Sequence, residues 1–199
     1  MTGRGLALLA AALAATAGCG GDDDERALRA PDPTRERADR PAKPPPGWRT
    51  VRNIRSGFTM PVPRTWSARK RGPATLIRSD DRLVSVTVAA DRTADGRRLP
   101  ARRFARATIR SLPDFKGRVA PRVRRVDGSP YQSARAEARG RLAVSKVPQR
   151  ITVAVFHRPR RVTYTVSVFR NARVRPGFNE PVIRRMLRGF RAQPPDFTP

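Results

Sequence analysis

The 199-residue sequence is poor in the residue types on which most catalytic and metal sites depend. It contains one cysteine, Cys19, and one histidine, His157. A catalytic triad or a zinc site needs several such side chains held together, and the chain lacks the partners for either. It also has no phosphate-binding glycine loop and no nucleophile elbow. These absences argue against an enzyme, a metal site and a bound cofactor.

Acidic residues are also few, with nine of them after residue 47. Most fall where turns or helix caps are expected. Asp80 and Asp81 are a candidate acid pair or metal contact, but adjacent side chains of a strand point apart and aspartate favours turns. We therefore interpret them as a turn. His157 is expected to lie exposed in a turn among arginines, which would lower its pKa, and we assign no catalytic residue.

No apolar run is long enough to span a bilayer. The longest, residues 6–15, follows a single positive charge and has the length of a signal-peptide core. Small residues then lead to Cys19. This order resembles the lipobox of bacterial lipoproteins, in which the cysteine thiol receives diacylglycerol and becomes the mature N-terminus. The resemblance implies a lipoprotein signal peptide over residues 1–18 and lipidation of Cys19.

Two alternatives to lipidation remain open. The sequence Ala15-Thr16-Ala17 fits an ordinary cleavage site and free secretion, and the apolar run also fits an uncleaved anchor. A secreted protein with one unpaired thiol at its new N-terminus would carry a liability, which favours the lipoprotein. We expect a protein anchored by Cys19 to the cell membrane, on its extracytoplasmic face.

Residues 19–47 predict a disordered tether. Asp, Arg, Glu and Pro dominate this segment, and it holds too few large apolar side chains to offset the entropy of ordering. Three consecutive prolines, residues 44–46, stiffen its end toward polyproline II. The remaining residues, 48–199, are numerous enough to form one domain with a hydrophobic core and no disulfide.

The formal net charge of +27 belongs entirely to residues 48–199, because basic and acidic residues balance over the first 47. One interpretation is a surface that binds polyanions. The other is a GC-rich genome, which overuses arginine, and it is suggested by the fact that only four of the 43 basic residues are lysine. Both interpretations stay open. Even without selection for binding, the positive field attracts the domain to anionic surfaces.

Clusters of arginine are the candidate polyanion sites, although each is also explained as a solvated face. There are three such clusters: Arg158, Arg160 and Arg161 in a predicted turn; Arg122, Arg124 and Arg125 in a weakly patterned predicted strand; and Arg184, Arg185 and Arg188 on the outer side of the last predicted helix, where Arg191 is also placed. Single-stranded nucleic acid needs exposed aromatic rings for stacking, and the chain has only twelve aromatic residues, several of them needed in the core. An envelope location also argues against chromosomal DNA. Anionic lipid, an anionic wall polymer or an envelope protein is the expected partner.

Residues 150–170 predict a β-hairpin at the centre of an antiparallel sheet. From 162 to 168, apolar residues alternate with Thr and Ser, which places them on opposite faces of a strand. From 151 to 156 both rows are largely apolar, which indicates a strand covered on both faces. Residues 157–161 are the predicted turn, where Pro159 has no amide to donate.

The rest of the chain predicts more strands and two helices. Pattern and turn residues give strands near 51–54, 58–62, 75–77, 83–89, 118–126 and 131–142, and helices over 99–112 and 180–190. In 131–142 the Ala and Glu content favours a helix, but the alternation of Ala with charged residues favours a strand, which we choose. This order indicates the α+β class, an antiparallel β-sheet with helices packed on it.

Several motifs together resemble PsbP-like domains. They are the run from Gly57-Phe58 to Trp66, the Asp127-Gly128 turn before a strand of small residues, the strand containing Tyr164, and the terminal Arg188-Gly189-Phe190. The resemblance, over roughly residues 54–190, implies an α/β/α sandwich. Members of this superfamily are mainly binding or assembly modules, and actinobacterial lipoproteins carry such domains. We expect a non-catalytic binding or scaffolding module of the cell envelope, with polyanion binding as the alternative.

Overall fold

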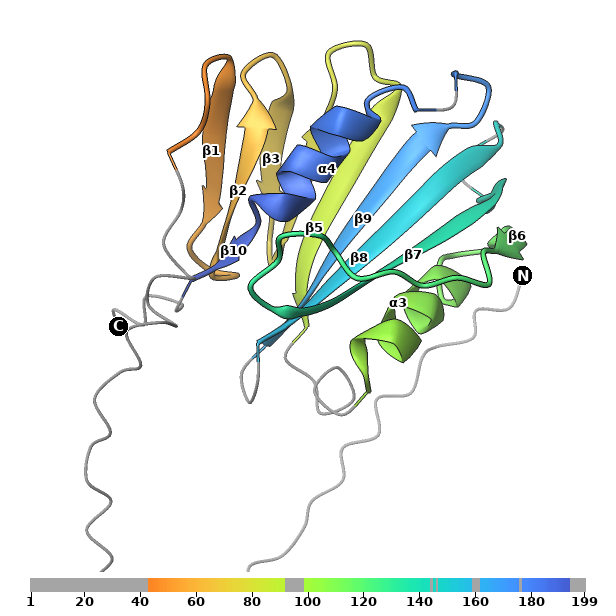
Figure 1. Ribbon diagram of the computed structural model, residues 1–199. Helices are drawn as coiled ribbons and strands as arrows, with labels where there is room; N and C mark the ends of the chain where they lie inside the picture. Colours follow the sequence, from red (N-terminus) through yellow and green to blue (C-terminus); the bar gives the residue numbers. More distant parts are fainter. Residues whose placement is uncertain are drawn as a thin grey trace, which may run out of the picture. The chain divides into compact units, whose positions relative to one another are not determined.

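The computed structural model describes residues 43–91, 99–143, 145, 147–158, 162–175 and 177–193. The predicted signal peptide, Cys19, the tether up to residue 42, and the candidates Arg160 and Arg161 lie outside these residues. Helix and strand labels follow Figure 1, in which the described helices are α3 and α4. Within the described ranges, no helix is both long and apolar enough to cross a membrane.

The described residues form two antiparallel sheets and two helices, which confirms the predicted α+β class (Figure 1). The larger sheet has seven strands in the order β3-β4-β5-β9-β8-β7-β6. Its strands are β3 (Ser67–Arg71), β4 (Ala74–Arg78), β5 (Val84–Asp91), β6 (Lys116–Val119), β7 (Gln132–Arg141), β8 (Gln149–Arg158) and β9 (Val162–Asn171). The smaller sheet has the order β1-β2-β10, with β1 (Trp48–Asn53), β2 (Phe58–Pro63) and β10 (Arg191–Ala192).

The β8–β9 hairpin occupies the centre of the larger sheet, as predicted. The two strands pair from Gln149↔Asn171 to Arg158↔Val162. Tyr164, Val166 and Val168 belong to one hydrophobic cluster, and the intervening Thr and Ser side chains lie on the other face. Alternate residues of β8 enter two different clusters, so this strand is covered on both faces as expected.

Each face of the larger sheet carries one helix. Helix α3 (Ala101–Arg110) buries Ala101, Ala105 and Ile109 against β7 and β8, where the alanines of β7 let it approach closely. Helix α4 (Glu180–Arg188) buries its apolar side chains in the cluster on the opposite face, which also contains residues of β5, β9 and the smaller sheet. Figure 1 shows α4 in front of β5 and β9. The structure therefore has the layered arrangement that the sequence resemblance implied.

Aromatic rings join the smaller sheet to this body. Phe190, between α4 and β10, stacks on Phe156 with ring centroids 4.5 Å apart and on Phe58 at 5.9 Å. Two tyrosines add hydrogen bonds to this cluster. The hydroxyl of Tyr164 donates to the Gly57 carbonyl oxygen at 2.7 Å, and the hydroxyl of Tyr131 accepts from the Ala192 amide at 2.9 Å.

Several predicted boundaries are wrong. His157 and Arg158 belong to β8 and are not in the turn. The strand predicted over 118–126 is reduced to β6 and an isolated bridge between Arg124 and Arg135. Helix α4 ends at Arg188, so Arg191 lies in β10 and not on the helix. Strand β3 was missed because it is an edge strand of mostly exposed basic residues, which has no apolar alternation and protects the edge from pairing with another chain.

Candidate functional site

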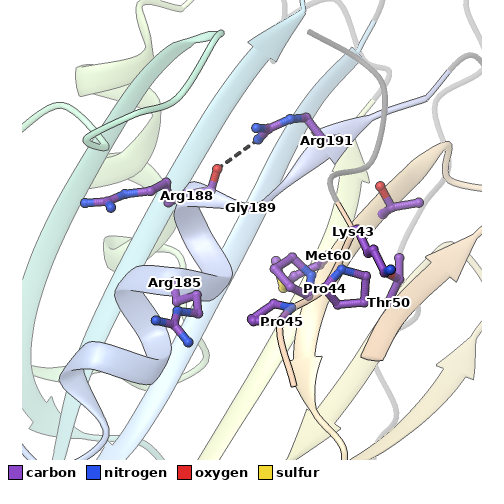
Figure 2. A pocket seen from close by; sticks show the side chains of 11 residues that line it. Lys43, Pro44, Pro45, Thr50, Met60, Arg185, Arg188, Gly189 and Arg191 are labelled. Carbon is purple, nitrogen blue, oxygen red and sulfur yellow. Dashed lines mark hydrogen bonds between the residues drawn. The ribbon is translucent and has the colours of Figure 1, made fainter. Parts of the chain in front are cut away.

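A pocket of about 350 Å³ lies beside the C-terminal end of α4, between that helix, strands β1 and β2, and the segment that precedes β1 (Figure 2). We call it the basic pocket. It is lined by Lys43, Pro44, Pro45, Thr50, Thr59, Met60, Pro61, Arg185, Arg188, Gly189 and Arg191. The residues come from opposite ends of the described chain, so the pocket depends on the folded domain.

The close approach of α4 to β2 shapes one side of the basic pocket. A Cβ atom at Gly189 would lie 2.3 Å from Pro61 Cγ, which is too close for any side chain. Gly189 follows directly after the helix, and its amide donates to the Arg185 carbonyl at 2.9 Å. The glycine in the Arg188-Gly189-Phe190 motif therefore serves the contact between the helix end and the strand.

Part of the pocket wall is apolar. Met60 is fully buried in the hydrophobic core, so its side chain lies behind this wall. Pro44 and Pro45, from the segment before β1, and Pro61 of β2 supply the proline rings of this wall. Because proline rings have little conformational freedom, this wall loses little entropy when a ligand binds.

Four basic residues line the pocket, and none of its lining residues is acidic. Arg191 Nη1 donates to the carbonyl oxygens of Arg188 and Phe190, each at 2.8 Å, which caps the end of α4. The Arg185 guanidinium lies 5.3 Å from the ring centroid of Trp48. In Figure 2 the Arg188 side chain extends away from Pro44 and Pro45, whereas Lys43 lies beside Pro44.

Thr59 supplies an unsatisfied polar group. The residue is 2% exposed, and its hydroxyl oxygen Oγ1 has no hydrogen-bond partner among the residues that the structure describes. A buried hydroxyl without a partner costs about 1–3 kcal/mol. Thr59 pairs with Arg191 across β2 and β10, so their side chains leave the same face of the smaller sheet.

The structure brings together only some of the predicted arginines. Arg185 and Arg188 line the basic pocket, whereas Arg184 is exposed on α4 and does not. Arg158 lies at the end of β8 and is not part of the lining either. Sequence reasoning missed Lys43, because it falls in the predicted tether, and Thr59, because one threonine in a strand carries no signal of an unpaired hydroxyl.

His157 is buried, contrary to the sequence expectation. Its Nδ1 lies 2.7 Å from Thr163 Oγ1 and its Nε2 lies 2.9 Å from the Leu99 carbonyl oxygen. The carbonyl can only accept, so Nε2 carries the proton and the Thr163 hydroxyl donates to Nδ1. Burial lowers the pKa of His157 below its ordinary value and outweighs the hydrogen bond to Leu99, which raises it. His157 thus fixes the chain just before α3.

The acid pair of the sequence is a turn, as interpreted. Asp81 Oδ1 accepts hydrogen bonds from the Ser79 hydroxyl and from the Leu83 amide, the latter at 2.9 Å, and closes the connection between β4 and β5. Over the described part of the chain, no group of three or more His, Cys, Asp or Glu side chains is placed to hold a metal ion.

No family model matches the sequence, and no curated protein matches it. Among solved structures, the Ran-binding protein Mog1p of Saccharomyces cerevisiae is similar at 12% identity, covering 73% of this chain and 95% of its own, with a TM-score of 0.49. A crystal structure from Bacteroides thetaiotaomicron has 9% identity, 74% and 49% coverage and a TM-score of 0.49. LpqN of Mycobacterium tuberculosis, described as involved in cell envelope biogenesis, has 12% identity, 69% and 83% coverage and a TM-score of 0.44. At scores this low, the three likenesses assign neither a family nor a function to the chain.

Proposed function

We propose that this protein is a lipid-anchored envelope lipoprotein whose PsbP-like domain binds a ligand without transforming it. The observation that carries the proposal is the basic pocket, which combines cations, an apolar wall and one unpaired hydroxyl. These groups recognise charge and apolar surface. The side chains that exchange protons near neutral pH, or that act as thiolate or carboxylate nucleophiles, are not part of its lining.

The proposed anchor is Cys19. Its place after a short apolar run and small residues supports lipidation, and the polar segment that follows supports a tether to the outer face of the membrane. Mass spectrometry of the mature N-terminus tests this. We expect a diacylglyceryl group on Cys19, and release of a Cys19→Ser variant from the membrane fraction. An unmodified Cys19, or a mature chain that begins at Gly18, would reject the anchor.

Ligand binding is tested by recovering the protein from its own envelope and recording its mass under native conditions. We expect an added mass on the wild type and on Arg184→Gln, whose changed residue lies on α4 outside the pocket. The double variant Arg185→Gln/Arg191→Gln should lose that mass, because the pocket then keeps only two of its four cations, Lys43 and Arg188. Equal occupancy of all three proteins would show that the basic pocket is not the binding site.

A second candidate function is attraction to a polyanion such as anionic lipid or a wall polymer. Arg184, Arg185 and Arg188 are all exposed on one helix, and the formal net charge of the chain is +27. An attraction of this kind is screened by salt, because it depends on charges separated by water. Sedimentation with anionic vesicles should therefore disappear at moderate salt. Salt-resistant sedimentation would contradict it and favour an apolar contact.

A further inference from the structure

We infer that the basic pocket takes an amphiphilic anion, a small molecule with a phosphate or carboxylate head and an apolar body. The inference rests on the proposed binding function and names its ligand class. Three features of the pocket carry it: the sign of its charge, the unpaired hydroxyl of Thr59, and the apolar wall opposite the arginines.

The head group is placed by Thr59 and Arg191. They are paired residues of β2 and β10, and both line the basic pocket. Arg191 makes both of its hydrogen bonds to the helix end through Nη1, while a guanidinium has five N–H donors. Its remaining donors and the Thr59 hydroxyl are therefore available to the oxygens of one anion. Binding of that anion satisfies a hydroxyl that the described chain leaves without a partner.

The apolar body is placed by the prolines. Pro44, Pro45 and Pro61 are half-buried and present hydrocarbon surface without polar hydrogen atoms. An inorganic anion would leave this wall in contact with water, whereas an alkyl chain would cover it. An apolar tail therefore adds affinity in proportion to the surface that it removes from water.

Size limits the ligand further. The volume of about 350 Å³ is near the lower end of the range of roughly 300–1,000 Å³ that small-molecule pockets occupy. Such a pocket holds one small molecule or the end of a lipid, and it does not enclose a polymer strand. Because residues 43–45 form one wall, the pocket lies where the proposed membrane tether joins the domain. A lipid of the same leaflet and a free metabolite of the same chemistry are the two sources.

Calorimetric titration of the full chain carrying Cys19→Ser, which takes no acyl group, tests the inference. The probes are decyl phosphate, decanoate, inorganic phosphate and decanol. We expect at least one of the two amphiphilic anions to bind, and at least tenfold more tightly than inorganic phosphate or decanol. That tenfold difference reflects a charge-assisted hydrogen bond for the head and a few buried methylene groups for the tail. Equal binding of decanol, or of inorganic phosphate, would overturn the inference.

Thr59→Val is the decisive variant. It keeps the shape of the side chain and removes the unpaired hydroxyl, so the fold should keep its thermal stability or gain some. Binding of the anionic probe should nevertheless weaken about tenfold, and Arg191→Gln should weaken it by at least as much. Arg184→Gln is the matched control and should bind like the parent. Unchanged binding by Thr59→Val, with the fold intact, would overturn the placement of the head group.

Vesicles of phosphatidylglycerol distinguish the two sources. If the vesicles compete with the soluble probe, and Thr59→Val abolishes that competition, the ligand is a lipid head group. If the soluble probe binds and the vesicles do not compete with it, the ligand is a free amphiphile. Both results support the pocket. Failure of every soluble probe and of the vesicles to bind would reject the ligand class. The proposed function would survive that result if the wild type recovered from its envelope still carried a mass that Arg185→Gln/Arg191→Gln lacks.

Discussion

Glu180 Oε1 accepts a hydrogen bond from Arg135 Nη2 at 2.7 Å, across 45 residues of sequence. Its second oxygen, Oε2, accepts from Arg170 Nη1 at the same distance. Glu180 is in the first turn of α4, where a negative charge also complements the helix dipole. One carboxylate thus fixes the start of α4 to β7 and β9, and the other end of the same helix lines the basic pocket.

We predict that Glu180→Gln destabilises the fold by about 3 kcal/mol, because it removes the charge partner of the partly buried Arg170 and leaves Arg135 with only the exposed Glu137. The side chains of Arg135 and Arg170 are only 18% and 12% exposed. Urea unfolding measures the effect. Glu137→Gln is the control: Glu137 also pairs with Arg135, but it is 52% exposed and should cost less than about 1 kcal/mol. Equal losses for the two variants would contradict this account.

The same carboxylate predicts a dependence of stability on pH. Burial alone would raise the pKa of Glu180, but hydrogen bonds and charges from Arg135 and Arg170 outweigh it and hold that pKa below its ordinary value of 4.5. The unfolded chain therefore takes up the proton first as the pH falls. The stability difference between wild type and Glu180→Gln should be constant above pH 4.5 and shrink below it. A stability difference that grows as the pH falls would mean that the pKa of Glu180 is raised in the folded protein, and would refute this account.

His157 predicts a second pH effect at higher pH. Because its pKa in the folded protein lies below the ordinary value of 6.5, the unfolded chain is protonated first. Relative to a His157→Gln variant, the wild type should keep a constant stability above pH 6.5 and lose stability as the pH falls below that value. Thermal unfolding at several pH values measures this. A wild type that gains stability in the same range would show that the charged imidazole is favoured in the fold.

The elements with strong hydrophobic alternation were predictable from the sequence. The alternation in β9 and in β7 outweighed the helix propensity of alanine in β7, because alternate alanines fill the narrow space beneath α3. The apolar stripe of α4 was equally clear. Strand β3 was not predictable, since its basic residues lie at an exposed edge and bury almost nothing.

The candidate site was predictable only in its charge. Arg185 and Arg188 were singled out as exposed cations of the last helix, and both line the basic pocket. The apolar wall was not predictable, because Pro44 and Pro45 lie in a segment with the composition of a tether. They line the pocket only because the fold places them beside strands that are distant in the sequence. His157 was misplaced for a related reason: the run of arginines after it suggested a turn, but β8 extends to Arg158 and buries the imidazole.

The contact between Gly189 and Pro61 gives the last prediction. Gly189 has a φ of −85°, which any residue adopts, so a substitution there acts through space and not through backbone strain. In Gly189→Ala the new Cβ atom would meet Pro61 Cγ at 2.3 Å and Cδ at 2.8 Å, and the rigid proline ring cannot rotate away. We expect a loss of about 2 kcal/mol as the end of α4 moves from β2.

The double variant Gly189→Ala/Pro61→Ala should recover most of the loss that Gly189→Ala causes, which a double-mutant cycle of urea unfolding measures. Strictly additive effects would mean that the two residues do not press on each other, and that another contact sets the distance between the helix and the wall of the basic pocket.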